Sequence, residues 1–394
     1  MYGRLAAFVL LAGVAVAGCS AAPPRPAPAK VTARVIPSVP VWLESPQMTS
    51  ATTGWTLRWT QWGRNKSELV RTIDGGRTWT DVTPPAMATM LADDSLATVL
   101  RALDGEHAWV AICCTNYTSK WPTEVFVTAD GGRTWTESEP LDGVTASSPV
   151  SLSTAGYGDG WLVSAWGPGP GAAVFSRLYR TDDGGRHWSR LSTDLPSGCD
   201  NPSITVATTS AMWVSCASSR PSLLVSRDGG THWEPQVLPA LPCASTCGSG
   251  PGPQFFGRTG FMVVYDLTGR SYLLVSHDLG LTWQPAPLPP GAGKSPDVRF
   301  LSPSDGIVLP EVPRGSRVPT AYVTVNGGRT WTAARQGLRV TDAELLSFAF
   351  VTTRTWFAWY GSQAQAPAQA SVLFETRDSG LTWTRTTARA ASRG

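Results

Sequence analysis

The sequence is poor in charge, in lysine and in helical periodicity. Only 15% of its 394 residues are charged, the formal net charge is +3, and lysine occurs four times. Nucleic-acid-binding proteins usually carry a stronger basic excess, so we expect no nucleic-acid partner. The absence of a 3.6-residue apolar period argues against a helical bundle. A hydrophobic content of 42% nevertheless favours a packed globular chain over a disordered one.

The apolar run near the N-terminus, Leu5–Ala17, is too short to cross a bilayer comfortably, because a spanning helix needs about 20 residues. It follows Arg4 and ends in small residues, as an export signal does. The segment Val16-Ala17-Gly18-Cys19 resembles the lipobox of bacterial lipoproteins, in which the cysteine is acylated. We therefore expect residues 1–18 to be a lipoprotein signal peptide and Cys19 to be lipidated. The alternative is an ordinary secretory signal; either way the mature chain is exported, and the resemblance places it on the extracytoplasmic face of the cell membrane or envelope.

Residues 19–40 are expected to be the lipidated cysteine and a stiff tether, because six prolines lie between residues 20 and 40. Within the tether, Val31–Ile36 alternates enough to predict a short strand docked on the folded body. The body itself is expected at 41–388, with a C-terminal tail at 389–394.

Six further cysteines form an even set, which predicts disulfides in an exported protein: Cys113, Cys114, Cys199, Cys216, Cys243 and Cys247. The pair Cys199–Cys216 is predicted from its place across one hairpin. Cys243–Cys247 would close a long loop, and Cys113 and Cys114 would pair with each other or elsewhere. None of the spacings is a persuasive zinc pattern, so we expect no metal.

A nine-residue repeat organises the rest of the chain. It reads "TIDGGRTWT" at 72–80, and its third position is occupied in turn by Asp74, Asp130, Asp183, Asp228, Asp278, Asn326 and Asp378. The spacing is about 50 residues, and three short strand-like stretches precede each copy while its tryptophan opens a fourth. This pattern predicts an all-β fold, a seven-bladed β-propeller of four-stranded antiparallel blades with the repeat as the turn between the third and fourth strands.

The composition of the repeat suits a structural turn. Glycine tolerates positive φ, the aspartate accepts hydrogen bonds from turn amides, and the tryptophan fills space between blades. The pattern S/T-x-D-x-G-x-T-W is similar to the Asp-box, or BNR repeat, found in sialidases, xyloglucanases, sortilin-type receptors and the photosystem II assembly factor family. The signature here resembles the last family most. The resemblance implies a fold element that lies away from the catalytic or binding face.

The residues favour a binding protein over an enzyme. A glycosidase needs two carboxylates that face the scissile bond, and no pair stands out by its context. The four histidines, His107, His187, His232 and His277, all fall at the repeat-turn end of the blades. We therefore expect no catalytic residue, no cofactor and no metal; the alternative is an exo-sialidase-like glycoside hydrolase.

Propeller geometry directs the search for a binding site to the loops opposite the repeat turns. Five of the seven second-to-third-strand loops carry a cation, and two add a tryptophan. The candidate partner-binding residues are Trp62, Arg64, Lys66, Lys120, Trp121, Arg220, Arg270, Arg314 and Arg317. We expect the protein to bind a protein or glycan partner, and the cations favour an anionic one. We also expect a monomer that contacts the membrane through its lipid anchor only.

Overall fold

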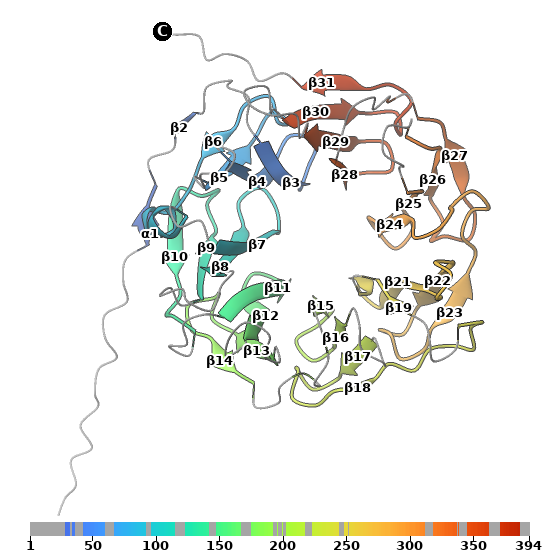
Figure 1. The fold of residues 1–394 in the computed structure, drawn as a ribbon, viewed down its shortest axis with the longest axis horizontal. Helices are drawn as coiled ribbons and strands as arrows, with labels where there is room; N and C mark the ends of the chain where they lie inside the picture. Colours follow the sequence, from blue (N-terminus) through green and yellow to red (C-terminus); the bar gives the residue numbers. More distant parts are fainter. Residues whose placement is uncertain are drawn as a thin grey trace, which may run out of the picture.

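The computed structural model describes residues 28–386, except for 32–33, 36–41, 60–66, 92–95, 115–122, 142–146, 167–174, 192–194, 196–198, 200–201, 217–222, 244–247, 251, 312–317, 337, 339–344 and 362–370. Seven antiparallel sheets surround a central channel, with the first strand of each sheet nearest the axis (Figure 1). The prediction of an all-β, seven-bladed propeller is therefore confirmed.

Each blade is a continuous stretch of chain. Blades 1 to 4 are β3–β6 (Trp42–Met48, Gly54–Trp59, Ser67–Thr72, Thr80–Asp81), β7–β10 (Leu96–Ala102, Ala108–Cys114, Glu124–Thr128, Thr134–Glu137), β11–β14 (Ser147–Ala155, Asp159–Trp166, Phe175–Thr181, Ser189–Arg190) and β15–β18 (Ser203–Val206, Met212–Ser215, Leu223–Ser226, Glu234–Pro235). Blades 5 to 7 are β19–β23 (Gly248–Ser249, Gln254–Phe256, Thr259–Tyr265, Ser271–Ser276, Gln284–Ala286), β24–β27 (Asp297–Phe300, Gly306–Leu309, Ala321–Thr324, Thr332–Ala334) and β28–β31 (Leu345–Phe350, Trp356–Gly361, Ser371–Thr376, Thr384–Thr386).

Every repeat turn is held by the same pattern of hydrogen bonds, with a histidine ring in place of the second hydroxyl in blades 3 and 4. In blade 1 the Thr72 hydroxyl donates to Asp74 Oδ1 (2.9 Å) and accepts the Gly76 N–H (2.8 Å). Asp74 then accepts the Thr78 N–H at Oδ1 (2.8 Å) and the Thr78 hydroxyl at Oδ2 (2.7 Å). In blade 6 Asn326 keeps this arrangement because its amide nitrogen donates to the Thr330 hydroxyl (2.7 Å). Gly75 and Gly76 have φ of 74° and 82°, which side chains other than glycine adopt rarely.

A second recurrent bond joins each repeat turn to the hairpin between the first two strands of its blade. In blade 1 the Gly75 N–H donates to the Thr52 carbonyl (2.8 Å). The equivalent donors are Gly131, Gly184, Gly229, Leu279, Gly327 and Ser379. Both kinds of turn thus share one end of the ring, which we call the turn face, and the other connections lie at the opposite end, the loop face.

The core lies between neighbouring blades. The tryptophans that open the second strands, Trp55, Trp109, Trp161, Trp213 and Trp356, are at most 1% exposed. Trp135 of blade 2 donates its indole N–H to the Val82 carbonyl of blade 1 (2.9 Å). Leu43 and Trp79 of blade 1 share a buried cluster with Phe357 and Leu373 of blade 7, so the ring is closed by apolar packing.

Two local features depart from the regular pattern. A six-residue helix, α1 (Pro85–Met90), buries Met87 and Met90 against the core between blades 1 and 2. Two apolar residues three positions apart are too short a signal to predict such a helix. The first strand of blade 5 is split into β19 and β20 by the Gly- and Pro-rich residues 250–253.

The N-terminal segment follows the outer rim of the ring. β1 (Ala29–Lys30) pairs with β10 of blade 2, and β2 (Arg34–Val35) pairs with β6 of blade 1 (Figure 1). β2 matches the docked strand expected within Val31–Ile36, whereas β1 is an additional strand. We call β1 and β2 the N-terminal strap. It covers outer strand edges that would otherwise be open to pairing with another chain.

The predicted bridge Cys199–Cys216 is confirmed, with its Cα atoms 4.8 Å apart. Cys243 is also disulfide-bonded, and its predicted partner Cys247 lies outside the described residues. Cys113 is fully buried in β8. The side chain of Cys114 lies outside the described part, as does Cys19.

Candidate ligand-binding cavity in the central channel

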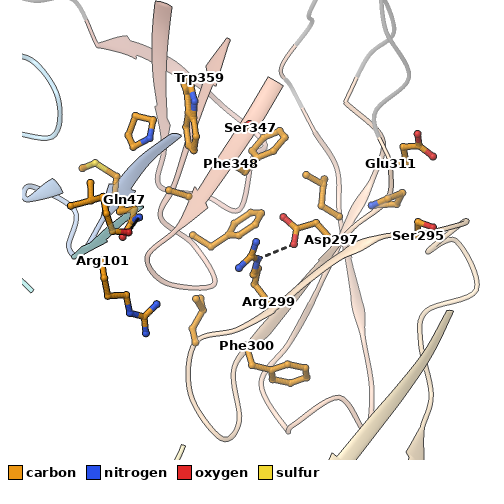
Figure 2. A pocket seen from close by; sticks show the side chains of 18 of the residues that line it. Gln47, Arg101, Ser295, Asp297, Arg299, Phe300, Glu311, Ser347, Phe348 and Trp359 are labelled. Carbon is orange, nitrogen blue, oxygen red and sulfur yellow. Dashed lines mark hydrogen bonds and ion pairs between the residues drawn. The ribbon is translucent and has the colours of Figure 1, made fainter. Parts of the chain in front are cut away.

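A cavity of about 780 Å³ occupies the central channel (Figure 2). Its walls come mainly from the inner strands β3 of blade 1, β7 of blade 2, β24 of blade 6 and β28 of blade 7. The cavity runs along the channel because it is lined both by residues next to the turn face, such as Arg101, and by residues next to the loop face, such as Glu311. It is large enough to hold a small ligand or a few residues of a peptide.

One wall of the cavity is apolar and aromatic. Phe348 and Phe350 lie two positions apart in β28, so both rings are on the same side of the strand, with their centroids 6.0 Å apart. Trp359 of β29 lies on the other face of this sheet, and with Met48 of β3 it adds apolar lining between blades 7 and 1. An apolar side chain of a ligand would be stabilised here, because contact with the rings removes its surface from water.

Arg101 is the one arginine of β7, and its side chain reaches into the channel (Figure 2). Its surface is exposed to channel water, although protein surrounds it on most sides. This partial loss of hydration lowers the pKa of the Arg101 guanidinium. Among the described residues, no carboxylate forms an ion pair with it. Arg101 is therefore a positive charge that a ligand can neutralise.

The backbone beside Arg101 is fixed by Gln47 of blade 1. The Gln47 side-chain amide donates to the Leu100 carbonyl (2.8 Å) and accepts the Ala102 N–H (3.0 Å). These two bonds flank Arg101 on both sides and join β3 to β7. Gln254 of blade 5 makes a similar bond to blade 6, because it accepts the Phe300 N–H (2.9 Å).

The wall formed by blade 6, across the ring from Arg101, carries both signs of charge. Arg299 Nε lies 2.9 Å from Asp297 Oδ1, and Glu311 lines the cavity nearer the loop face (Figure 2). Asp297 and Arg299 also line a crevice of about 290 Å³ that continues between blades 5 and 6. There, burial and the charge of Asp297 raise the pKa of Tyr265.

Most of the loop-face residues predicted from the sequence lie outside the described part of the chain. These are Trp62, Arg64, Lys66, Lys120, Trp121, Arg220, Arg314 and Arg317. Arg270 is described, and its guanidinium stacks over the Tyr272 ring at 5.5 Å. Its own N–H donates to Asp266 Oδ1 (3.0 Å), which holds the loop in a tight turn.

Sequence reasoning missed Arg101 and Arg299, the cations of the cavity. Each lies inside an apolar strand of the inner layer, "TVLRAL" and "DVRFLS" respectively. A charged residue within a short strand nearest the axis is the signal that could have indicated them, since it must face the channel to stay in contact with water.

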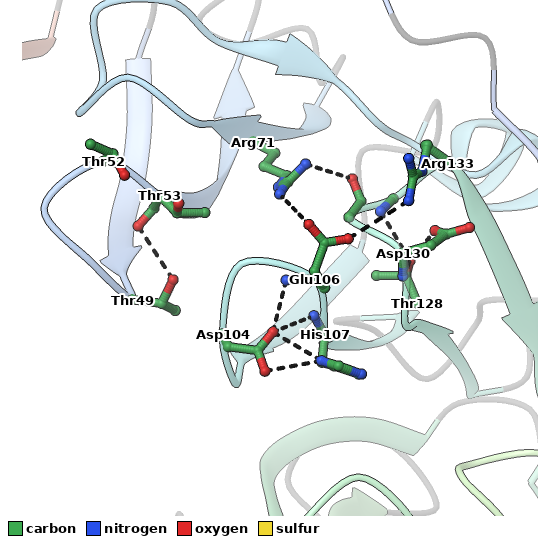
Figure 3. Close-up of polar contacts among 12 residues, drawn as sticks. Thr49, Thr52, Thr53, Arg71, Asp104, Glu106, His107, Thr128, Asp130 and Arg133 are labelled. Atoms are coloured by element: carbon green, nitrogen blue, oxygen red, sulfur yellow. Dashed lines mark hydrogen bonds and ion pairs between the residues drawn. The ribbon is translucent and has the colours of Figure 1, made fainter.

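Three histidines of the turn face, His107, His187 and His232, contact carboxylates. His187 Nδ1 and His232 Nδ1 each lie 2.6 Å from the aspartate of their own turn. His107 Nδ1 lies 2.9 Å from Asp104 Oδ1 (Figure 3), and the His107 ring stacks on Tyr157. Asp104 also accepts N–H groups of its hairpin, so it caps a turn. These contacts account for the histidines structurally.

One pair of carboxyl groups shares a hydrogen bond. Burial raises the pKa of Glu124 to about 7, and the charge and hydrogen bond of Glu137 add to the rise. Glycosidase carboxyl groups stand about 5 Å or more apart, so a hydrogen-bonded pair cannot flank a glycosidic bond. Across the described ranges, no three His, Cys, Asp or Glu side chains gather as metal ligands, and no helix is long and apolar enough to cross a membrane.

The fold and the cavity define the class of protein: a seven-bladed β-propeller with a ligand-sized central cavity. No protein-family model matches the chain, and no curated protein does. Solved structures share the fold. YCF48 bound to D1 peptide is 16% identical with a TM-score of 0.50, covering 89% of this chain and 95% of that one. Puromycin hydrolase is 11% identical with a TM-score of 0.53, covering 89% and 54%.

Prolyl oligopeptidase B from Galerina marginata is 9% identical with a TM-score of 0.51, and the match covers 90% of this chain and 52% of that one. The chain thus spans about half the length of both hydrolases. Identities this low show the fold alone, and the fold is shared by a peptide-bound protein and by enzymes.

Proposed function

We propose that this chain is a binding protein that takes a peptide segment of a partner into its central cavity. The observation that carries the proposal is Arg101, an uncompensated charge on a strand fixed by Gln47, in a cavity that Phe348 and Phe350 also line. A segment with a carboxylate for Arg101 and an apolar side chain for Phe348 and Phe350 fits both features. A solved neighbour of the same fold is a peptide complex, which makes a peptide the natural ligand to test.

The proposal includes export and anchoring. The lipobox-like segment that ends at Cys19 supports lipidation of that cysteine and a place on the outer face of the membrane. Labelling of growing cells with a fatty-acid analogue should mark the chain, and Cys19→Ala should abolish the label. Labelling that persists in the variant would contradict the assignment of Cys19.

Binding is tested with an array of short peptides in matched pairs that differ by Asp against Asn or by Glu against Gln. We expect acidic members with a neighbouring aromatic residue to bind and their amides to bind about 10- to 100-fold more weakly, since a charge-assisted hydrogen bond contributes about 1.5–3 kcal/mol. Arg101→Gln should remove the difference between the members of a pair. Arg385→Gln, on the outer strand of blade 7, is the matched control and should preserve it.

The predicted loop-face cations give a second variant. Replacing Arg314 and Arg317 together should weaken an acidic peptide if the segment leaves the channel through the loop face. Unchanged affinity would restrict the site to the channel itself.

A glycoside hydrolase is the alternative function, and one observation keeps it testable. Asp297 and Glu311 line the same cavity, so two carboxylates face one space. Aryl glycosides, sialosides included, are the probes. Turnover that disappears in Glu311→Gln would replace the binding proposal with an enzymatic one.

A further inference from the structure

Four consecutive blades each present one exposed aliphatic side chain on the turn face. The residues are Leu281 of blade 5, Val325 of blade 6, Leu381 of blade 7 and Ile73 of blade 1, exposed by 64%, 69%, 57% and 65%. We call them the aliphatic arc. They make up the majority of the large hydrophobic residues exposed in the described part of the chain.

Their exposure follows from the geometry of the repeat turn. In blade 1 the Thr72 hydroxyl and the Asp74 carboxylate are engaged inside the turn, and Trp79 enters the core. The position after the opening Thr or Ser is occupied by Ile73 and Val325 and points to solvent. The position directly before the second Thr of the repeat, occupied by Leu281 and Leu381, does the same. Rigid turns therefore hold the four tips out, because no neighbouring element covers them.

Basic side chains accompany the arc. Three exposed arginines of the same face, Arg258, Arg329 and Arg354, have no ion-pair partner among the described residues. Arg77 and Arg377 approach Glu375, at 3.7 and 2.7 Å. Glu375 is itself buried, so it offers little negative charge to a surface that approaches from outside.

Blades 2 to 4 lack the pattern. Their residues at the first outward position are Ala129, Asp182 and Arg227, and none of these is a large exposed aliphatic. Blade 2 adds the acidic Glu106, which pairs with Arg71 at 3.2 Å and with Arg133 at 3.8 Å (Figure 3). The turn face is thus divided into a half that bears exposed aliphatic side chains and a half that lacks them.

We propose that the aliphatic arc is a membrane-docking surface for a bilayer that contains anionic lipid. Separate aliphatic tips, one to a blade, match a fluid interface into which each can insert, whereas a protein partner is usually met by one contiguous apolar patch. The unpaired arginines are exposed on turns of the same face, where lipid phosphate groups would receive them. This contact is independent of the peptide cavity and of any lipid attached to the chain.

The test places a fluorophore on the arc of the full chain in vesicles of phosphatidylcholine and phosphatidylglycerol. Leu381→Cys carries the polarity-sensitive label NBD on the arc. Val237→Cys carries it at an equally apolar exposed position of the connection that follows β18, and it is the matched control. The parent chain, labelled in parallel, gives the background from native cysteines. Because any anchor is common to both variants, the comparison reports on the arc alone.

We expect the label at 381 to shift its emission to the blue and to be quenched by spin-labelled lipid, and the label at 237 to do neither. Adding Ile73→Ser and Val325→Ser should return the emission at 381 to its value in buffer, and vesicles without phosphatidylglycerol should weaken the quenching. Equal behaviour of the two labels, or no quenching at 381, would overturn the proposal and leave the arc as a surface for a protein.

Discussion

The carboxyl pair of blade 2 makes the stability of this propeller depend on pH near neutrality. Glu124 begins β9 and Glu137 ends β10, and the pairing of Glu137 with Phe126 places the two glutamates as diagonal neighbours on one face. Burial, then the charge and hydrogen bond of Glu137, raises the pKa of Glu124 to about 7 from an ordinary value of 4.5. Folding therefore favours the protonated form of Glu124.

The direction of the effect follows from linkage. The contribution of protonated Glu124 to the free energy of unfolding is fully present below the pKa of Glu124 in the unfolded chain. It is lost as pH rises through about 7, because Glu124 must then give up its proton and stand as a second negative charge beside Glu137. Each tenfold change in the protonation equilibrium corresponds to about 1.4 kcal/mol. Glu124 remains half exposed, so solvent screening reduces the loss to about 1–2 kcal/mol at high pH.

Glu124→Gln keeps a hydrogen-bond donor for Glu137 but cannot ionise. We expect the variant to match the parent at pH 4 and to exceed it by about 1–2 kcal/mol at pH 8.5. Urea unfolding followed by tryptophan fluorescence across this range measures the difference. Glu234→Gln, at the start of β18 in blade 4, is the control and should leave the slope unchanged. Parallel pH profiles for the parent and Glu124→Gln would refute the reasoning.

Two further substitutions test the turns and the bridge. Asp183→Ala should lower the free energy of unfolding by about 1–3 kcal/mol, because it leaves the His187 and Arg186 N–H groups and the Thr181 hydroxyl without their acceptor; unchanged thermal unfolding would contradict the role assigned to this side chain. Cys216→Ser should cost about 3 kcal/mol, since the Cys199–Cys216 bridge closes a loop with a sequence separation of 17. Cys199→Ser removes the same bridge and should give the same urea midpoint, and a midpoint equal to that of the parent in either variant would refute the assignment.

The repeat allowed the architecture to be predicted, because each copy fixes a turn and every turn is flanked by strands of predictable order. Asn326 shows why the pattern tolerates substitution: its amide oxygen and nitrogen replace the two carboxylate oxygens. The bridge Cys199–Cys216 was predictable for the same reason, since both cysteines could be placed on one hairpin.

The cavity was harder to predict because it depends on contacts between blades. Gln47 fixes the strand that carries Arg101 across 53 to 55 positions of sequence, and no local pattern indicates such a pair. Arg101 and Arg299 line the same cavity only because blades 2 and 6 face each other across the closed ring. The aliphatic arc was overlooked for a different reason. Ile73 and Val325 belong to the repeat, and the Thr, Asp, Gly and Trp of the repeat explained its recurrence from blade to blade without reference to its outward positions.

The N-terminal strap has a consequence for the order in which the protein is made. β1 precedes its partner β10 by more than 100 residues, and β2 precedes β6 by more than 40. Synthesis from the N-terminus therefore delivers both strap strands before either partner exists. The outer edges of blades 1 and 2 can pair with β1 and β2 only once β10 and β6 have been made. A ribosome-bound chain that ends within β9 would thus leave β1 accessible to protease, and extension past β10 would protect it.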